Sequence, residues 1–322
     1  MGNYMDLLNK VGKTPLIRLT MDGFNLTDIF VKLEYYNPTG SVKDRAASYI
    51  LPKLLNDNLI NQDTTIIESS SGNFGISLST YCRFLNLNFL CVIDPNITTV
   101  NEVLIKNLSS EVIKVMVPDK HGGYLLSRIN KVKELLKTRE NSYWINQYAS
   151  YYNAEAYYES LGSEICEELD HIDYLFMGVS SGGTITGVSQ RVKEKFPSCK
   201  VIAVDTEGSV IFGGQAKKRY IPGVGSSMVP NILTQSRIDD VVIIEEYKAV
   251  QMCHRLLREN SMLVGGSSGL VLSAIEKYFR GKNLSIRPKI LTIFPDRGER
   301  YMDTIYNADW CNRFLSISTT VN

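Results

Sequence analysis

The chain carries the stretch Asn-Pro-Thr-Gly-Ser-Val-Lys-Asp-Arg at residues 37–45, where a turn rich in proline, glycine and serine leads into a helical pattern. A lysine at such a junction, here Lys43, can be held over a concave site. Desolvation there lowers the pKa of its amine and frees the amine to attack a carbonyl carbon. Lys43 is therefore a candidate Schiff-base residue, although a lysine after Gly-Ser is more often a solvated residue at a helix start. The rest of the chain decides between these interpretations.

Three more turns, rich in serine and glycine, each follow a short apolar run and begin a helical pattern. They are residues 69–73 (SSSGN), 180–184 (SSGGT) and 265–269 (GGSSG). Free backbone N–H groups at a helix start bind anions, and glycine lets the backbone approach a phosphate closely. The turn at 180–184 is no P-loop, because no Gly-Lys-Ser/Thr follows, and no dinucleotide fingerprint, because the G-x-G-x-x-G spacing is absent. Each turn alone could be an ordinary helix cap.

Taken together and in this order, the lysine segment and the three turns resemble the motifs of the cysteine synthase and cystathionine beta-synthase family, which are pyridoxal 5'-phosphate (PLP) enzymes. The resemblance covers nearly the whole chain. It implies an α/β fold of fold type II, like the tryptophan synthase beta chain, with two open twisted α/β domains and the cofactor in the cleft. It also implies a large PLP-binding domain at residues 1–36 and 147–322, a small mobile domain at 37–146, and a homodimer that acts on small amino acids.

The resemblance assigns a role to individual residues. Lys43 would carry the cofactor and serve as acid and base in catalysis. Asn73 would contact the ring oxygen, and Ser267 would hydrogen-bond the pyridine nitrogen, which leaves the ring a weaker electron sink suited to β-elimination. The residues expected at the cofactor phosphate are Ser180, Ser181, Gly182, Gly183 and Thr184. Those expected at the substrate carboxylate are Ser69, Ser70, Ser71, Gly72 and Gln147.

Some residues depart from a plain cysteine synthase. Phe74 stands where that family has threonine, and Ser180-Ser181 stands where it has Gly-Thr. Several segments instead resemble N-(2-amino-2-carboxyethyl)-L-glutamate synthases, namely residues 121–125, 143–148, 207–213, 222–226 and 295–300. Those enzymes join O-phospho-L-serine to L-glutamate through an aminoacrylate and release phosphate. They thereby start L-2,3-diaminopropionate formation in siderophore and peptide-antibiotic pathways.

The same resemblance places Arg128, Tyr148 and Ser180 at the substrates. Glutamate brings two carboxylates and phosphoserine a phosphate, which call for a guanidinium and hydroxyl groups, whereas sulfide needs no anchor. Arg128 could equally be a solvated cation on its helix. The alternative activity is a cysteine synthase that uses O-acetylserine or O-phosphoserine with sulfide. A non-catalytic scaffold is opposed by the joint presence of Lys43, Asn73 and Ser267.

Composition is that of an ordinary globular protein with room for two domains, because 44% of the 322 residues are hydrophobic and 21% are charged. A net charge of +1 without a compact basic block argues against nucleic acid as a partner. The chain has no run of 18 apolar residues and no signal-like start, so we expect no membrane partner and a cytoplasmic protein. Six cysteines without a C-x-x-C pair and three histidines without H-E-x-x-H predict no metal site.

Apolar runs alternate with helical patterns along the chain, which is typical of parallel sheets covered by helices. The expected strands are residues 65–68, 89–93, 112–117, 175–179, 201–204, 241–244 and 290–294. Between them, Leu125, Ile129, Val132 and Leu136 form a helical stripe. We find no internal repeat or low-complexity segment.

Overall fold

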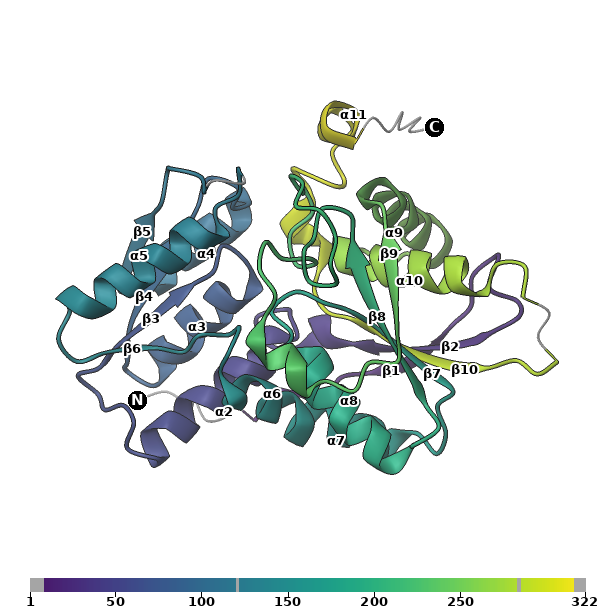
Figure 1. Ribbon diagram of the computed structural model, residues 1–322, viewed down its shortest axis with the longest axis horizontal. Coiled ribbons are helices and arrows are strands. Elements are labelled where there is room, and N and C mark those ends of the chain that lie inside the picture. Colours follow the sequence, from purple (N-terminus) through teal and green to yellow (C-terminus); the bar gives the residue numbers. More distant parts are fainter. Residues whose placement is uncertain (1–8, 120–121, 283–284, 316–322) are drawn as a thin grey trace.

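The computed structural model describes residues 9–119, 122–282 and 285–315. It contains two β-sheets with helices on both faces, which lie side by side in Figure 1. The strand order is β5-β4-β3-β6 in the four-stranded sheet and β1-β2-β10-β7-β8-β9 in the six-stranded sheet. Every strand pair in the described residues is parallel except β1–β2. This architecture confirms the predicted α/β fold with two sheets.

We call the four-stranded sheet with its helices the small half. Its strands are β3 (Thr65–Ser69), β4 (Asn88–Ile93), β5 (Glu111–Lys114) and β6 (Ser142–Trp144), and its helices are α3 (Asn73–Phe84), α4 (Thr99–Leu108) and α5 (Leu125–Thr138). We call the six-stranded sheet with its helices the large half. Its strands are β1 (Leu16–Leu19), β2 (Asp28–Leu33), β7 (Tyr174–Gly178), β8 (Lys200–Thr206), β9 (Asp240–Ile244) and β10 (Lys289–Phe294).

The remaining helices belong to the large half or join the two halves. They are α2 (Lys43–Asn56), α6 (Tyr151–Tyr157), α7 (Ser163–Glu168), α8 (Gly183–Lys195), α9 (Glu246–Asn260), α10 (Gly266–Phe279) and α11 (Ala308–Leu315). A π-helical turn, η2 (Tyr158–Gly162), continues α6 into α7. Three 3-10 turns are η1 (Glu34–Tyr36), η3 (Asn231–Gln235) and η4 (Gly298–Tyr301). Helix α11 projects at the top of Figure 1.

Alternating side chains give the small sheet two buried faces, because successive residues of a strand point to opposite sides. Ile66 and Phe89 join a core formed with α2, α3 and α4. The neighbouring Ile67 and Leu90 join a second core with Val132 of α5. Burial on both faces explains why consecutive residues of β3 and β4, such as Ile66-Ile67 and Phe89-Leu90, are apolar.

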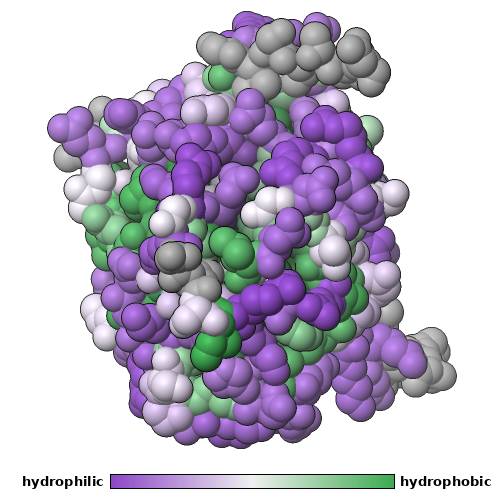
Figure 2. Space-filling view, turned by 90° about the vertical axis from the view of Figure 1, so that its right-hand side faces the viewer, coloured by the Kyte–Doolittle hydropathy of each residue, from purple (hydrophilic) through white to green (hydrophobic). Residues whose placement is uncertain are grey.

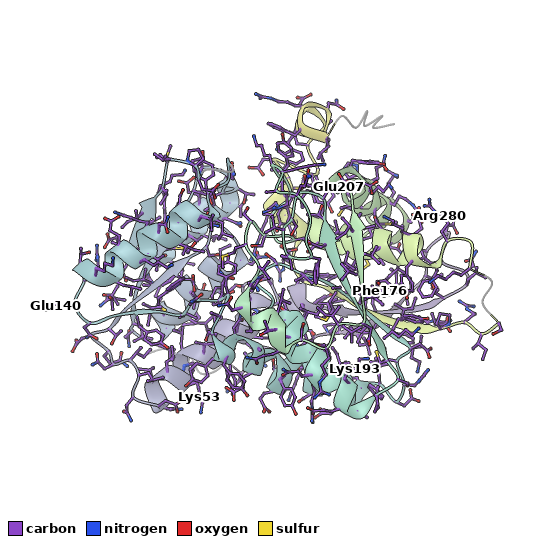
Figure 3. The ribbon with its side chains drawn as sticks, in the orientation of Figure 1. Lys53, Glu140, Phe176, Lys193, Glu207 and Arg280 are labelled. Atoms are coloured by element: carbon purple, nitrogen blue, oxygen red, sulfur yellow. The ribbon has the colours of Figure 1, made fainter. Side chains whose placement is uncertain are left out.

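The large sheet is built in the same way. Leu175 and Met177 of β7 pack on the side of α6, α7 and α8, and Phe176 between them packs with α9 and α10. The ring of Phe176 lies 5.4 Å from that of Tyr278 at the end of α10. Figure 3 shows Phe176 in the interior of the large half, while Lys193 lies at its outer surface. The large sheet thus has one hydrophobic core on the face covered by α8 and another on the face covered by α10.

Helices α2 and α6 connect the two halves, since α2 packs against both α3 and α6. One hydrophobic cluster extends through the junction and includes Ile50, Ile66 and Ile185. Helix α8 crosses α6 at Gly187, where an added Cβ would lie 2.1 Å from the carbonyl oxygen of Ala154. This close approach holds the amino-terminal end of α8 beside the start of α2.

The structure extends the predicted elements and adds others. Each predicted strand is present, but β5 ends at Lys114, before the predicted end at 117. The short strands β1, β2 and β6 were not predicted. The division of strands between the sheets falls near the predicted domain borders, but those borders and the mobility of residues 37–146 remain predictions.

The outer surface is mainly polar on the face shown in Figure 2, where hydrophobic residues lie in small groups among hydrophilic ones. No helix among the described residues is both long and apolar enough to cross a membrane. In the same part of the chain, no three His, Cys, Asp or Glu residues gather as metal ligands. All six cysteines are buried and unpaired.

Candidate active site

A cavity of about 330 Å³ lies between the two halves. Its wall includes the segments that follow the carboxyl ends of β3, β4, β6, β7 and β10. Ligands of open α/β sheets bind at this edge, because the loops there converge. All residues predicted for the cofactor and the substrates line the cavity, except Gly183.

Lys43 is the first residue of α2, and it lines the cavity between the two halves. The N–H of Val42 donates to the carbonyl of Pro295 at 2.8 Å, which ties the start of α2 to the end of β10. The Nζ atom lies 3.4 Å from Ser181 Oγ and 5.8 Å from the ring centre of Tyr157. Burial lowers the pKa of Lys43 from 10.5 to about 8. A substantial fraction of the amine is therefore neutral near pH 8.

A buried ionic network holds α2 from behind. Arg45 forms a two-pronged contact with Glu34, with Nε–Oε2 at 2.6 Å and Nη2–Oε1 at 2.8 Å. It also contacts Glu164 of α7 at 2.7 Å, and Lys32 of β2 pairs with Glu168 at 2.7 Å. The sequence analysis missed this network, since charged residues on a helical pattern usually face solvent. It fixes α2 two residues beyond Lys43.

The turn at 180–184 presents backbone donors to the cavity. Gly182 has a φ of 87°, a left-handed conformation that favours glycine, and Gly183 begins α8. The N–H groups of Gly182, Gly183 and Thr184 make no hydrogen bond within the described residues. Gly183 faces Asn153 rather than the cavity, because an added Cβ would lie 2.4 Å from Asn153 Nδ2. The predicted role of Gly183 at a phosphate would therefore rest on its backbone N–H.

The turn after β3 combines a helix cap with free donors. Ser70 Oγ accepts from the N–H of Gly75 at 3.0 Å, so this hydroxyl caps the first turn of α3. The N–H groups of Ser71, Asn73 and Phe74 make no hydrogen bond in the described part of the chain. All three residues line the cavity. The turn thus offers three amide donors to a carboxylate.

Arg128 reaches the same turn from α5 but is already engaged. Its Nε lies 3.1 Å from Asp94 Oδ2, and its Nη1 donates to Ser71 Oγ at 3.1 Å. Ser71 Oγ in turn donates to Asp94 Oδ2 at 2.9 Å. Arg128 is not a solvated cation on its helix, which was the alternative interpretation, because only 12% of its side chain is exposed. Its predicted contact with a substrate would have to be shared with Asp94.

Asn73 and Ser267 lie on the side of the cavity next to β10. Asn73 Nδ2 donates to Asp296 Oδ2 at 2.7 Å, and Asn73 Oδ1 accepts from Arg300. Tyr301 also donates to Asp296, whose pKa is nevertheless raised by burial. The hydroxyl of Ser267, at the start of α10, makes no hydrogen bond within the described residues. It remains available to a ligand in the cavity.

A buried carboxyl group supports the wall near β6. Glu68 accepts from the N–H of Ser69 at 2.7 Å, from Trp144 Nε1 at 3.1 Å and from the N–H of Gln147 at 3.2 Å. Burial raises the pKa of Glu68 to about 7 despite these donors. Gln147 Nε2 donates to the carbonyl of Ser69 at 3.3 Å. Glu68 therefore ties the turn after β3 to the segment after β6.

The loop of residues 216–227 closes the cavity on the large half. The Ser180 hydroxyl donates to the carbonyl of Gly225 at 3.2 Å, which links this loop to the turn after β7. Arg219, from this loop, lines the cavity together with Arg128 and the buried Tyr148, and the charges of both arginines act on the Tyr148 phenol. Burial raises the pKa of Tyr148 to about 12, so its phenol stays protonated at neutral pH.

The sequence analysis missed four residues of the site: Glu68, which supports the cavity wall, and Asp94, Asp296 and Arg219, which line the cavity. The first three lie at or just after a strand end, as do many ligand-binding residues of α/β proteins, and that position was a usable signal. Arg219 lies in a loop without a motif, so no local pattern distinguished it.

The residues present fit PLP. The free N–H groups at the start of α8 would hold a phosphate, the amine of Lys43 would hold the aldehyde carbon, and the unpartnered hydroxyl of Ser267 would meet the ring nitrogen. Gly72 leaves room beside them, because an added Cβ would meet no atom within 4 Å. These assignments to individual residues are predictions that the arrangement supports.

Comparisons with known proteins agree with this reading of the cavity. The sequence pattern of the pyridoxal-phosphate dependent enzymes matches residues 7–296. An O-acetylserine dependent cystathionine beta-synthase from Helicobacter pylori is 30% identical, with a TM-score of 0.87 over 95% of this chain and 100% of its own. A lysine-to-alanine variant of O-ureido-L-serine synthase, solved with O-ureido-L-serine, is 27% identical, with a TM-score of 0.86 over 94% of this chain and 93% of its own.

A hydrogen sulfide-producing enzyme, solved with an α-aminoacrylate intermediate, is 32% identical, with a TM-score of 0.85 over 93% of this chain and 90% of its own. Fold and cavity together define a fold type II PLP enzyme. The chain belongs to the pyridoxal-phosphate dependent enzymes, in the branch of cysteine synthase and cystathionine beta-synthase, and is a transferase that performs β-replacement. The three similar enzymes differ in product, so membership of the family leaves the second substrate open.

Proposed function

We propose that the enzyme joins O-phospho-L-serine to L-glutamate, giving N-(2-amino-2-carboxyethyl)-L-glutamate and phosphate for L-2,3-diaminopropionate formation. The observation that carries the proposal is that two guanidinium groups, those of Arg128 and Arg219, line one cavity together with the phenol of Tyr148. Two acidic substrates require such groups, whereas sulfide does not. The hydroxyl of Ser180 lines the same cavity and could become a further donor if it released the carbonyl of Gly225.

PLP, when bound, would withdraw electrons from the α-carbon of the donor, so that its β-substituent can leave. The neutral amine of Lys43 would take the proton from the α-carbon, and the lowered pKa of this lysine favours that role. The free N–H groups of Ser71, Asn73 and Phe74 would orient the donor carboxylate. Phe74 lines the cavity and is buried, so its ring would present an apolar surface to the bound substrates.

The second candidate is a cysteine synthase that uses O-acetylserine or O-phosphoserine with sulfide. This second candidate is supported by the 32% identity to a hydrogen sulfide-producing enzyme. Under either activity we propose a homodimer, with a large PLP-binding domain at 1–36 and 147–322 and a small mobile domain at 37–146. The borders of the sheets support this division.

The test supplies the PLP-loaded protein with O-phospho-L-serine and L-glutamate and follows phosphate release together with the product mass. We expect one adduct per phosphate and no adduct with the Lys43→Ala variant. Equal concentrations of sulfide and glutamate then compete for the same donor. Cysteine as the only product in that competition would replace the proposed reaction with the cysteine synthase reaction.

A further inference from the structure

Arg219 places in the cavity a positive charge that no neighbouring carboxylate neutralises by contact. Its Nη1 donates to the carbonyls of Gly208 at 2.6 Å and Ser226 at 3.4 Å, and its Nη2 donates to Ser227 Oγ at 3.2 Å. All three acceptors are neutral. Within the described residues, Arg219 forms no ion pair, although its side chain is partly buried and lines the cavity.

The other arginine of the cavity is in the opposite situation. Arg128 is paired with Asp94 at 3.1 Å, so most of its charge is compensated. The acidic groups that act on Arg219, mainly Asp205 and Glu246, do so without contact, and burial lowers its pKa. The carboxylate of Glu246 accepts hydrogen bonds from the N–H groups of residues 220 and 221, at 2.7 to 3.0 Å. The guanidinium charge of Arg219 is therefore available to pair with an anion that enters the cavity.

We propose that Arg219, with the Ser227 hydroxyl and the phenol of Tyr148, forms a second anion subsite that binds an oxyanion of an acidic substrate. Arg219 and Ser227 belong to the 216–227 loop of the large half, Tyr148 follows β6, and the turn after β3 lines the same cavity from the small half. A guanidinium offers a planar fork that matches carboxylate and phosphate oxygens. The Tyr148 phenol keeps its proton at neutral pH and can donate it to the same group.

The subsite explains how the cavity could hold a substrate with two anionic groups. The α-carboxylate of the donor would occupy the turn after β3, and the second anion would face Arg219. That second anion is either the phosphate of the donor or the side-chain carboxylate of the nucleophile. This inference rests on the proposed function for the identity of the substrates, but its charge requirement can be tested separately.

The experiment measures dissociation constants by calorimetry with the PLP-loaded protein and two matched pairs of probes. One pair is O-phospho-L-serine against O-acetyl-L-serine, and the other is L-glutamate against L-glutamine. The variants are Arg219→Gln, which removes the positive charge, and Arg219→Lys, which keeps the charge but lacks the planar, two-pronged donor geometry of a guanidinium. Arg237→Gln is the control, because this exposed arginine lies outside the cavity and makes no side-chain contact in the described chain.

We expect Arg219→Gln to weaken binding of the charged member of at least one pair by roughly ten- to a hundredfold, with less than about a threefold change for its neutral partner. Arg219→Lys should recover part of the loss, and Arg237→Gln should change neither pair. The affected pair identifies the source: the serine pair indicates the donor phosphate, and the glutamate pair indicates the nucleophile carboxylate.

Two results would overturn the subsite. Equal losses for charged and neutral probes would mean that Arg219 only holds the 216–227 loop in place. A wild-type protein that binds the charged member of neither pair more tightly would mean that no second anion subsite exists. A failure of the proposed function looks different, because the wild-type protein would then make cysteine and no glutamate adduct, while the serine pair would still decide the role of Arg219.

Discussion

At the scale of single residues, burial shifts the pKa values of two groups in opposite senses, one that lines the cavity and one that supports its wall. Burial disfavours the charged form of any group, so it lowers the pKa of Lys43 to about 8 and raises that of Glu68 to about 7. Lys43 gains nucleophilic and basic character from this shift. Glu68 makes no contact with the reacting groups and serves to join the turn after β3 to the segment after β6.

The role of Lys43 as cofactor carrier leads to a direct prediction. Borohydride treatment of the PLP-loaded protein should attach the cofactor covalently to the peptide that contains Lys43, as read by mass spectrometry. Lys43→Ala should abolish both the attachment and β-replacement, because no other lysine among the described cavity residues takes this position at the start of α2. The same modification on a different lysine peptide would refute the assignment.

The protonation of Glu68 predicts a pH dependence of stability. Because its pKa is raised from 4.5 to about 7, the folded state binds more protons than the unfolded state between these values. Stability from this group is therefore full below about pH 4.5 and falls as the pH rises towards 7, by about 1–3 kcal/mol. Urea unfolding of wild type and Glu68→Gln at pH 5, 6 and 7 should show a smaller decrease in the variant. Parallel curves would argue against this ionisation.

At the scale of elements, α2 is held by charge at one end and by apolar packing along its length. Arg45 and Glu34 are fully buried, and their two-pronged contact satisfies both charges. The burial of Ile50, Leu51 and Leu54 anchors the following turns. Both sets of contacts fix the direction in which Lys43 enters the cavity.

Removing one partner of this buried pair should be costly. Arg45→Met leaves the carboxylate of Glu34 buried without its cation, whereas Glu164 keeps its ion pair with Lys32 at 3.1 Å, so we expect a loss of about 3–5 kcal/mol in urea unfolding. The matched control is Arg18→Met, because Arg18 forms an exposed pair with Asp28 and should cost less than about 1 kcal/mol. Similar losses in both variants would show that the buried network has no special role.

At the scale of the whole molecule, the two halves meet across the cavity at a few polar contacts. Thr99, at the start of α4, donates to Asp303 Oδ2 at 2.9 Å, and Arg300 donates to the carbonyl of Thr39. The contact at Asp303 is exposed, so it adds little stability. Contacts this few and this weak are compatible with the predicted movement of the small half relative to the large half.

If the small half moves, Asp303→Ala should shift it towards a more open arrangement. We expect KM for the donor to rise severalfold with little change in kcat, since the variant loses a contact outside the cavity. The control is Asp63→Ala, an exposed aspartate of the small half that is remote from Asp303. Unchanged KM in Asp303→Ala would indicate that this contact does not control closure.

Local patterns in the sequence determined much of this protein. The Lys43 segment, the three serine-glycine turns and the alternating apolar runs predicted parallel sheets, helix starts and a cavity residue set, because each is a short-range signal that needs only neighbouring residues. The family resemblance connected these signals into one fold. Element ends were less certain, as the early end of β5 shows, since strand pairing rather than composition stops a strand.

The tertiary structure alone decided which charges are matched. Arg128 and Asp94 pair across 34 positions of the chain, Arg45 and Glu164 pair across 119, and Asn73 meets Asp296 across 223. No local spacing encodes these contacts, because they depend on how the two sheets and α2 pack together. Among the described residues, the same packing leaves Arg219 without a carboxylate in contact, so the charge that this cavity offers to a substrate is a property of the folded chain.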